Sequence, residues 1–183
     1  MCTLDEFNID VGRLGQSAVE ADYLLDDSYF KAIGGSSDAK SGDVKAHVRC
    51  HKTAAGCSVD MHVEGTVTVS CDRCLDDMQL QISGSNTLTV KFVDDYNGTE
   101  PMYDGETMTV NPDDAVINIA WPLYETIALA IPARHVHDEG QCNEGMRKAL
   151  DRYMDDSRNG DESRRQTDHR WDALLNIKTS DEQ

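Results

Sequence analysis

The chain has 183 residues, of which 39% are hydrophobic and 28% are charged, and its mean hydropathy is -0.55. This composition is typical of a soluble globular protein that is long enough to bury a core. No segment supplies the ~20 apolar residues of a membrane helix, since the most apolar stretch is interrupted by Pro122, Glu125 and Pro132. The first ten residues hold three acids and no signal region, so we expect a cytoplasmic location.

The formal net charge of -17 is concentrated in residues 1–142, which hold 24 acidic and 9 basic residues, whereas residues 143–183 hold 10 and 8. A body with this field repels phosphate groups, so we expect direct nucleic-acid binding to be weak. The same field attracts basic partners, and ribosomal proteins are the most common basic proteins of a bacterial cytoplasm. Acidic charge also keeps a protein soluble, so charge by itself identifies no partner.

Alternating apolar and polar residues predict strands along the first half of the chain. The pattern covers residues 7–11 and 19–25, and Asp26 or Asp27 then begins a short helix that Gly34 and Gly35 end. Strand patterns return in five segments: residues 44–50, 57–63, 66–70, 78–82 and 87–93. Gly65 is expected to separate the second of these segments from the third. The sequence therefore predicts a meander of about five to seven antiparallel strands.

The stretch from Thr109 to Pro132 is predicted to turn helical. Residues 119–131 are apolar on nearly every side, which is typical of a largely buried helix. Pro122 fits a first turn, and Pro132 ends the helix by excluding helical geometry at the residue before it. The predicted fold class is therefore α+β, with an antiparallel sheet and one buried helix packed on it.

The composition changes after Cys142. Residues 143–183 are charged and poor in large apolar residues, so we expect a mobile helical tail that follows a single domain at residues 1–142. A short helical motif is predicted at residues 168–178, where Asp168 can cap the helix. One face of this motif would carry a candidate partner-binding group, or a group that caps the core of residues 1–142: Trp171, Leu174 and Leu175.

Cys71 and Cys74 lie three positions apart between two strand patterns, at the expected tip of a hairpin. This placement is typical of a zinc knuckle, whereas a thioredoxin-like redox pair needs a helix after it. Two cysteines do not close a structural zinc site, and residues 133–142 hold further ligands at suitable spacing. The predicted zinc ligands are Cys71, Cys74, His137 and Cys142, with His135 as the alternative histidine. The competing interpretation is an ordinary thiol at Cys142 and two solvated histidines.

Motifs of common enzyme classes are missing: the sequence has no P-loop, dinucleotide-binding loop, nucleophile elbow or H-E-x-x-H helix. We therefore expect a protein without enzymatic activity. Three cysteines without a histidine would leave an open zinc position, so a zinc-dependent RNA-processing hydrolase stays an alternative. A thiol redox switch at Cys71 and Cys74 is the other alternative. Cys50 and Cys57 are predicted to be core residues.

The order of three segments, TVTVSCDRCL, INIAWPLYETIALAIP and HVHDEGQC, resembles the bacterial YceD family, the large ribosomal RNA subunit accumulation proteins. The shared features are a C-x-R-C-L motif at residues 71–75, an acidic residue in an apolar helix (Glu125) that ends in a proline (Pro132), and a segment with cysteine or histidine. The ending DHRWDALLNIK is similar to the D-P-R-W-x-x-L of one bacterial branch, with His169 in place of proline. The resemblance covers roughly residues 4–176.

The resemblance implies involvement in the synthesis, processing or stability of large-subunit ribosomal RNA, and it implies no known enzymatic activity. The expected partner is then a basic ribosomal protein or a large-subunit assembly intermediate. Metal binding is inferred from ligand spacing, and a zinc ion bound to the four ligands would contribute folding free energy.

Overall fold

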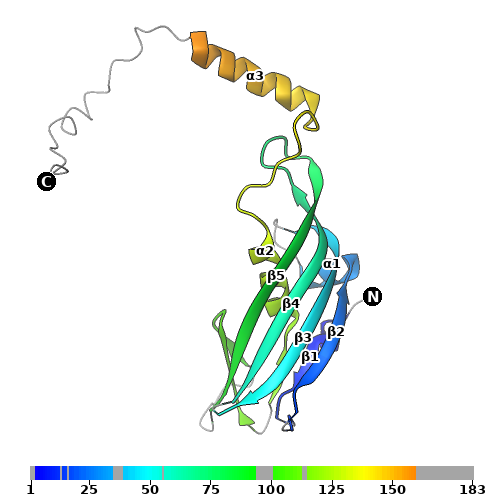
Figure 1. Ribbon diagram of the computed structural model, residues 1–183, viewed down its shortest axis with the longest axis vertical. Coiled ribbons are helices and arrows are strands. Elements are labelled where there is room, and N and C mark those ends of the chain that lie inside the picture. Colours follow the sequence, from blue (N-terminus) through cyan, green and yellow to red (C-terminus); the bar gives the residue numbers. More distant parts are fainter. Residues whose placement is uncertain are drawn as a thin grey trace, which may run out of the picture. The chain divides into compact units, whose positions relative to one another are not determined.

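The computed structural model describes residues 3–12, 14–15, 17–34, 39–54, 56–93, 101–112 and 115–159. The chain divides into two compact units, Met1–Cys142 and Asn143–Gln183, and each is described by itself (Figure 1). None of the described helices is long and apolar enough to cross a membrane.

The first unit is built on a six-stranded sheet (Figure 1). Across the sheet the strands are, in order, β2 (Val19–Leu25), β3 (Ser41–Thr53), β4 (Gly56–Ser70), β5 (Asp77–Phe92), β7 (Thr107–Val110) and β6 (Met102–Tyr103). The first four strands pair antiparallel with their neighbours in sequence, as the predicted meander requires. β7 pairs parallel to β5, which is the one departure from an antiparallel arrangement among the pairings in the described part of the chain.

In β3 and β4, the apolar residues of the alternating sequence pattern are buried and most of the polar residues between them are exposed or half-buried. On both strands every second side chain faces the core and is at most 1% exposed. These residues are Val44, Ala46, Val48, Cys50, Cys57, Val59, Met61 and Val63. The prediction that Cys50 and Cys57 are core residues is therefore confirmed.

The predicted break at Gly65 is wrong. β4 continues through this residue, which pairs with Val44 on one side and Ile82 on the other. A Cβ atom here would lie 2.2 Å from the carbonyl oxygen of Asp43, and φ is +156°. Glycine thus allows a close approach of two backbones inside a continuous strand instead of ending the strand.

A two-stranded sheet stands beside the large one. It pairs β1 (Asn8–Asp10), which follows the 3-10 helix η1 (Leu4–Phe7), with β8 (Val116–Asn118).

The helix predicted to start near residue 109 begins later than expected, at Ala120. Residues 107–110 alternate in burial and join the large sheet as β7, and residues 116–118 pair with β1. Pairing with distant strands overrides the local pattern here.

Helix α1 (Asp27–Ile33) has the predicted ends. Asp26 caps it, because its Oδ1 accepts hydrogen bonds from the backbone N–H of Ser28 at 2.9 Å and of Tyr29 at 3.3 Å. Gly34 ends it in the left-handed region, with φ of 73°.

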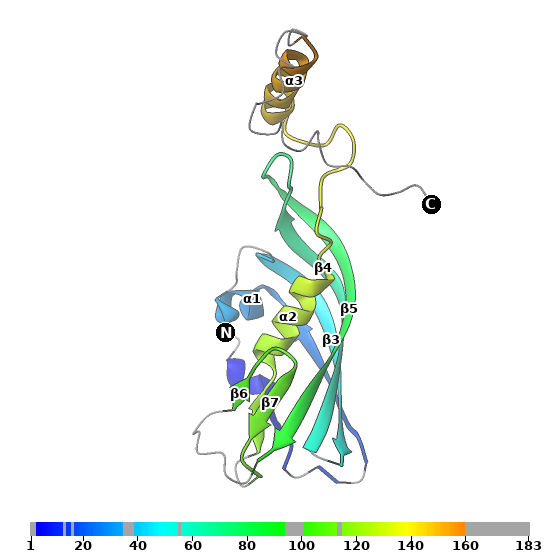
Figure 2. The same cartoon turned by 90° about the vertical axis from the view of Figure 1, so that its left-hand side faces the viewer.

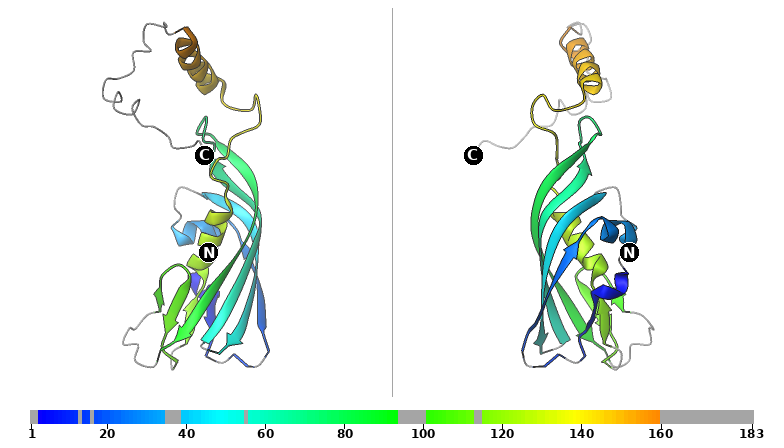
Figure 3. Two further views of the ribbon diagram at one scale, coloured as in Figure 1. Left: turned by 60° about the vertical axis from the view of Figure 1, so that its left-hand side comes forward. Right: turned by 90° about the vertical axis from the view of Figure 1, so that its right-hand side faces the viewer.

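Helix α2 (Ala120–Ala130) packs on the same face of the sheet as α1 (Figures 2 and 3). Leu123 and Ile127 are fully buried against the strands, whereas Trp121 is 45% exposed and Leu129 is 79% exposed. The prediction of a largely buried helix is therefore confirmed for most of α2, and Trp121 and Leu129 are the exposed exceptions.

The second unit contains helix α3 (Glu144–Asn159). The side chain of Asn143 accepts hydrogen bonds from the backbone N–H of Gly145 and Met146 at its start, and Lys148 pairs with Glu144 at 2.9 Å. The predicted motif at residues 168–178, with Trp171, Leu174 and Leu175, lies outside the described residues.

The packing of α2 on β5 generates a test. A Cβ atom at Gly84 would lie 2.8 Å from the Cβ of Ala130, so Gly84→Ala pushes helix and strand apart. We expect the substitution to lower the free energy of unfolding by about 1–3 kcal/mol. Adding Ala130→Gly to the same chain should restore part of the loss, as measured by chemical denaturation.

Gly15→Ala is the matched control, because no atom of the described residues beyond its chain neighbours lies within 4 Å of a Cβ at that position. A Gly84→Ala protein as stable as the wild type would contradict the tight contact between α2 and β5.

Candidate metal centre

The first half of the candidate site is the turn between β4 and β5, residues 71–76. The backbone N–H of Cys71 donates to the carbonyl of Asp76 and that of Leu75 donates to the carbonyl of Cys71, both at 2.9 Å. Leu75 adopts a left-handed φ of 64°, which closes the turn. As a result both thiols point to the buried side, where Cys71 is fully buried and Cys74 is 5% exposed.

The second half is the segment that follows α2, residues 131–142, which Asp72 holds against the turn. The backbone N–H of Asp72 donates to the carbonyl of His135 at 2.9 Å, and the N–H of His135 donates to Oδ2 of Asp72 at 2.7 Å. The imidazole Nε2 of His135 also lies 3.6 Å from Oδ1 of Asp72. Two segments more than 60 positions apart are thus fixed side by side by their backbones.

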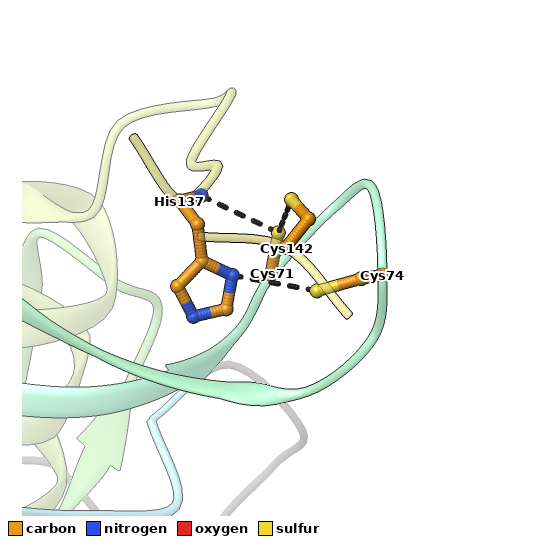
Figure 4. A group of neighbouring side chains, drawn as sticks. All are labelled: Cys71, Cys74, His137 and Cys142. Atoms are coloured by element: carbon orange, nitrogen blue, oxygen red, sulfur yellow. Dashed lines mark hydrogen bonds between the residues drawn. The ribbon is translucent and has the colours of Figure 1, made fainter. Parts of the chain in front are cut away.

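Four side chains converge where these segments meet (Figure 4). Each offers one ligand atom, and all four atoms lie within 4.8 Å of one another. The group consists of Cys71, Cys74, His137 and Cys142. It is the only such group of three or more His, Cys, Asp or Glu side chains in the described part of the chain.

The spacing of the donor atoms fits a tetrahedral metal ion. Thiolate sulfurs that each lie about 2.3 Å from zinc are roughly 3.8 Å apart, and a sulfur and an imidazole nitrogen are roughly 3.6 Å apart. The Sγ atoms of Cys71 and Cys142 are separated by 4.0 Å, and Sγ of Cys74 lies 3.3 Å from Nδ1 of His137. Three sulfurs and one imidazole nitrogen are a donor set typical of structural zinc sites.

The two candidate histidines are placed differently. His137 directs Nδ1 at the sulfur of Cys74, and its backbone N–H lies 3.5 Å from the sulfur of Cys71. His135 instead uses Nδ1 on the carbonyl of Pro132 at 3.0 Å and turns Nε2 toward Asp72. The structure therefore brings His137 into the cluster and leaves the alternative ligand His135 outside it.

The surroundings favour the thiolate form of Cys71. Burial works to raise the pKa of this thiol, but backbone N–H groups of His137, Cys74 and Arg73 point at the sulfur and lower the pKa to about 6. Burial and the neighbouring sulfurs of Cys74 and Cys71 raise the pKa of Cys142. Negative charges on neighbouring sulfurs repel one another, and a cation that binds the thiolates would offset this repulsion.

Sequence reasoning missed the role of Asp72. Its position inside C-x-x-C marks it only as a turn residue, and no spacing rule links it to His135.

The sequence also showed no sign of the contacts of Glu125, the acidic residue of α2. Glu125 accepts a hydrogen bond from the indole N–H of Trp121 at 3.0 Å and another from the hydroxyl of Tyr103. Glu125 therefore ties α2 to the short strand β6.

The fold and the cluster together define an α+β domain in which a knuckle-like hairpin and the segment after its helix bring four potential metal ligands together. Residues 59–178, more than half of the chain, match the family model described as large ribosomal RNA subunit accumulation protein YceD. The chain therefore belongs to the YceD family, as its motifs indicated, and the family implies a role in accumulation of large-subunit ribosomal RNA. Comparison with curated proteins and with solved structures gave no match.

The contact between Asp72 and His135 can be tested in metal-free protein. Asp72→Ala removes the acceptor for the His135 N–H, and we expect it to lower the free energy of unfolding by about 1 kcal/mol and to speed amide exchange at His135. Asp72→Asn keeps an acceptor oxygen and should have a smaller effect. Unchanged stability and exchange in Asp72→Ala would show that this contact does not hold the segment.

Proposed function

We propose that this protein is a non-enzymatic factor in large-subunit ribosomal RNA accumulation that binds a basic ribosomal partner and whose fold is stabilised by one zinc ion. The observation that carries the proposal is the closed donor set of the cluster, in a chain that belongs to the YceD family. Bacterial ribosomes are assembled in the cytoplasm, so the proposal also places the protein there.

Zinc bound to these residues would act as a structural cross-link. Cys71, Cys74 and Cys142 would supply thiolates and His137 its Nδ1 nitrogen, which joins the β4–β5 turn to the segment after α2. Because the four ligands come together only in the folded chain, the binding free energy of the ion would add to the free energy of unfolding.

The donor set argues against the two alternatives that the sequence leaves open. A catalytic zinc site keeps one position for water, and His137 would fill the position that three cysteines leave. A redox pair of Cys71 and Cys74 requires two sulfurs alone, whereas the convergence of a third sulfur and an imidazole on them is explained by a metal ion.

Charge supports a basic partner. The formal charge of residues 1–142 is -15, and acidic residues accompany the exposed apolar side chains of α2. Glu125 lies between Trp121 and Leu129 along the helix, and Asp104 and Glu106 are exposed next to Tyr103, which bonds to Glu125. A partner that buries the apolar side chains would bring cationic groups to these carboxylates. The part of Trp171, Leu174 and Leu175 in binding stays a prediction.

The zinc site predicts about one zinc ion per chain in protein purified without added metal, as measured by native mass spectrometry. At zinc concentrations about 1,000-fold above Kd, the ion contributes ~4 kcal/mol. Removal by a chelator should therefore lower the melting temperature by about 10 °C. Cys74→Ser should lose the ion, whereas Cys50→Ala, a core thiol outside the cluster, should keep it.

A metal-free protein that melts at the same temperature as the purified one would rule out a structural zinc. A disulfide formed under mild oxidant, with no bound zinc, would favour the redox alternative instead.

The cellular role predicts that depletion of the protein reduces free large subunits and leaves ribosomal RNA precursors, as measured on sucrose gradients and by RNA blotting. The purified protein should leave precursor ribosomal RNA uncut, because a zinc ion bound by all four ligands would keep no coordination position for water. A normal gradient after depletion would refute the role, and cleavage of the precursor would support the hydrolase.

A further inference from the structure

Strand β5 is paired along its whole length on only one side. β4 pairs with it from Asp77 to Lys91, whereas β7 pairs with it only from Thr89 to Phe92. The part of β5 before Thr89 therefore forms an edge of the sheet among the described residues (Figure 1).

Hydrogen bonds of Thr89 show which backbone groups face this edge. Its N–H donates to the carbonyl of Glu106 at 3.0 Å, next to β7, so it points away from β4. The register between β4 and β5 is unbroken from Gly56 and Lys91 to Ser70 and Asp77, so every second residue of β5 has the same orientation. The residues that point their N–H and C=O groups to the edge are Gln79, Gln81, Ser83, Ser85 and Thr87.

Most of these groups have no partner in the described part of the chain. The N–H of Thr87 is bonded by the side chain of Asn86 at 2.9 Å. The backbone groups of Gln79, Gln81, Ser83 and Ser85 that face the edge make no bond to any described residue. We call residues 79–85 the open edge.

The open edge lacks the usual protection against strand addition. Natural edges carry lysine, proline or a bulge, but residues 78–90 contain no charged residue and no proline, and the pairing with β4 has no bulge. An apolar side chain lies close by: Ala130 of α2 packs on Gly84, and Leu129 beside it is 79% exposed.

We propose that the open edge binds an extended, lysine- or arginine-rich segment of a protein as an added β-strand. The proposal rests on the proposed function, because it names the surface that holds the basic partner. Backbone hydrogen bonds would supply affinity and alternate side chains specificity, as in other cases of strand addition.

Charge selects the kind of segment. Asp76 is exposed just before β5, and Glu64 on β4 pairs with Ser83 and is exposed on the outer face. An added strand would lie about 10 Å from β4, and long lysine or arginine side chains on it would bring their charges nearer to these carboxylates, within the Debye length of about 8 Å in the cell. A nucleic acid is repelled by the same charges, and a second copy of this chain would bring two acidic bodies together.

Ser83→Pro tests the proposal, because it deletes an edge N–H without removing a bond to β4, and proline is tolerated at such positions. Ser83→Ala is the matched control, since it changes the side chain and keeps the N–H. The probe is a ten-residue peptide of alternating lysine and valine with blocked ends. We expect Ser83→Pro to weaken its binding at least ten-fold and Ser83→Ala to leave it within two-fold.

Equal binding by the two variants would overturn the proposal, as would equally tight binding of a peptide with glutamate in place of lysine. Zinc content and melting temperature verify that Ser83→Pro folds. A measurement on the wild type needs no variant: the amides of Gln79, Gln81, Ser83 and Ser85 should exchange more slowly when the peptide binds. Unchanged exchange would also overturn the proposal.

Complementation separates this proposal from the proposed function. In depleted cells, Ser83→Ala should restore large subunits and Ser83→Pro should not. Full rescue by Ser83→Pro would refute the open edge as the partner site and leave the ribosomal role intact. A normal gradient after depletion would instead refute that role. A dimer that Ser83→Pro dissociates would assign the edge to a second copy and overturn the proposal.

Discussion

The unbroken pairing of β4 with β5 is the constraint on which the other features depend. All 15 residues of β4 are paired with β5 in one continuous register. This long ribbon carries the Cys71–Asp76 turn at one end and exposes the edge of β5 along its side. It also gives α2 a surface to pack on, through the contact of Gly84 with Ala130. A bulge in the ribbon would reverse the faces of all residues beyond it, and the two cysteines would leave the buried side.

The cluster shows how a site is assembled from two segments that are far apart in the sequence. The turn fixes Cys71 and Cys74 relative to one another, and α2, anchored in the core by Leu123 and Ile127, fixes where the second segment begins. Asp72 holds that segment through hydrogen bonds that do not use the four ligand atoms. Because these hydrogen bonds hold the turn and the second segment together, an ion bound to the cluster would cross-link positions that are already close. Little of its binding free energy would then be spent on closing the loop between the two segments.

Acidic charge and backbone hydrogen bonding would make different contributions to recognition of a partner. The charge of residues 1–142 acts over several ångströms and selects for the sign of a partner, but it does not select a position on the surface. The unpaired backbone groups of β5 are local and directional, and they would specify where and in which conformation a segment binds. A zinc ion at the turn that precedes β5 would keep the start of this strand rigid without taking part in either interaction.

Much of this protein is determined by local patterns in its sequence. Alternation at residues 44–50 and 57–63 fixes which side chains reach the core, Asp26 and Gly34 fix the ends of α1, and the C-x-x-C spacing marks a turn that presents two sulfurs. These features depend on neighbours within a few positions, and the sequence displays them directly.

The tertiary structure decided the rest, because it depends on contacts between distant positions. The sequence predicts that Gly65 separates two strands, yet Gly65 pairs with Val44 of β3 and lies inside one continuous strand. Trp121 and Leu129 belong to a helix that the sequence predicts to be largely buried, and only the packing of α2 leaves these two side chains exposed. The sequence names His137 as the ligand and keeps His135 as the alternative, and the tertiary structure directs His137 at the sulfur of Cys74 while the His135 backbone pairs with Asp72. No local pattern encodes that pairing, since its two partners are brought together only after β4, β5 and α2 have packed.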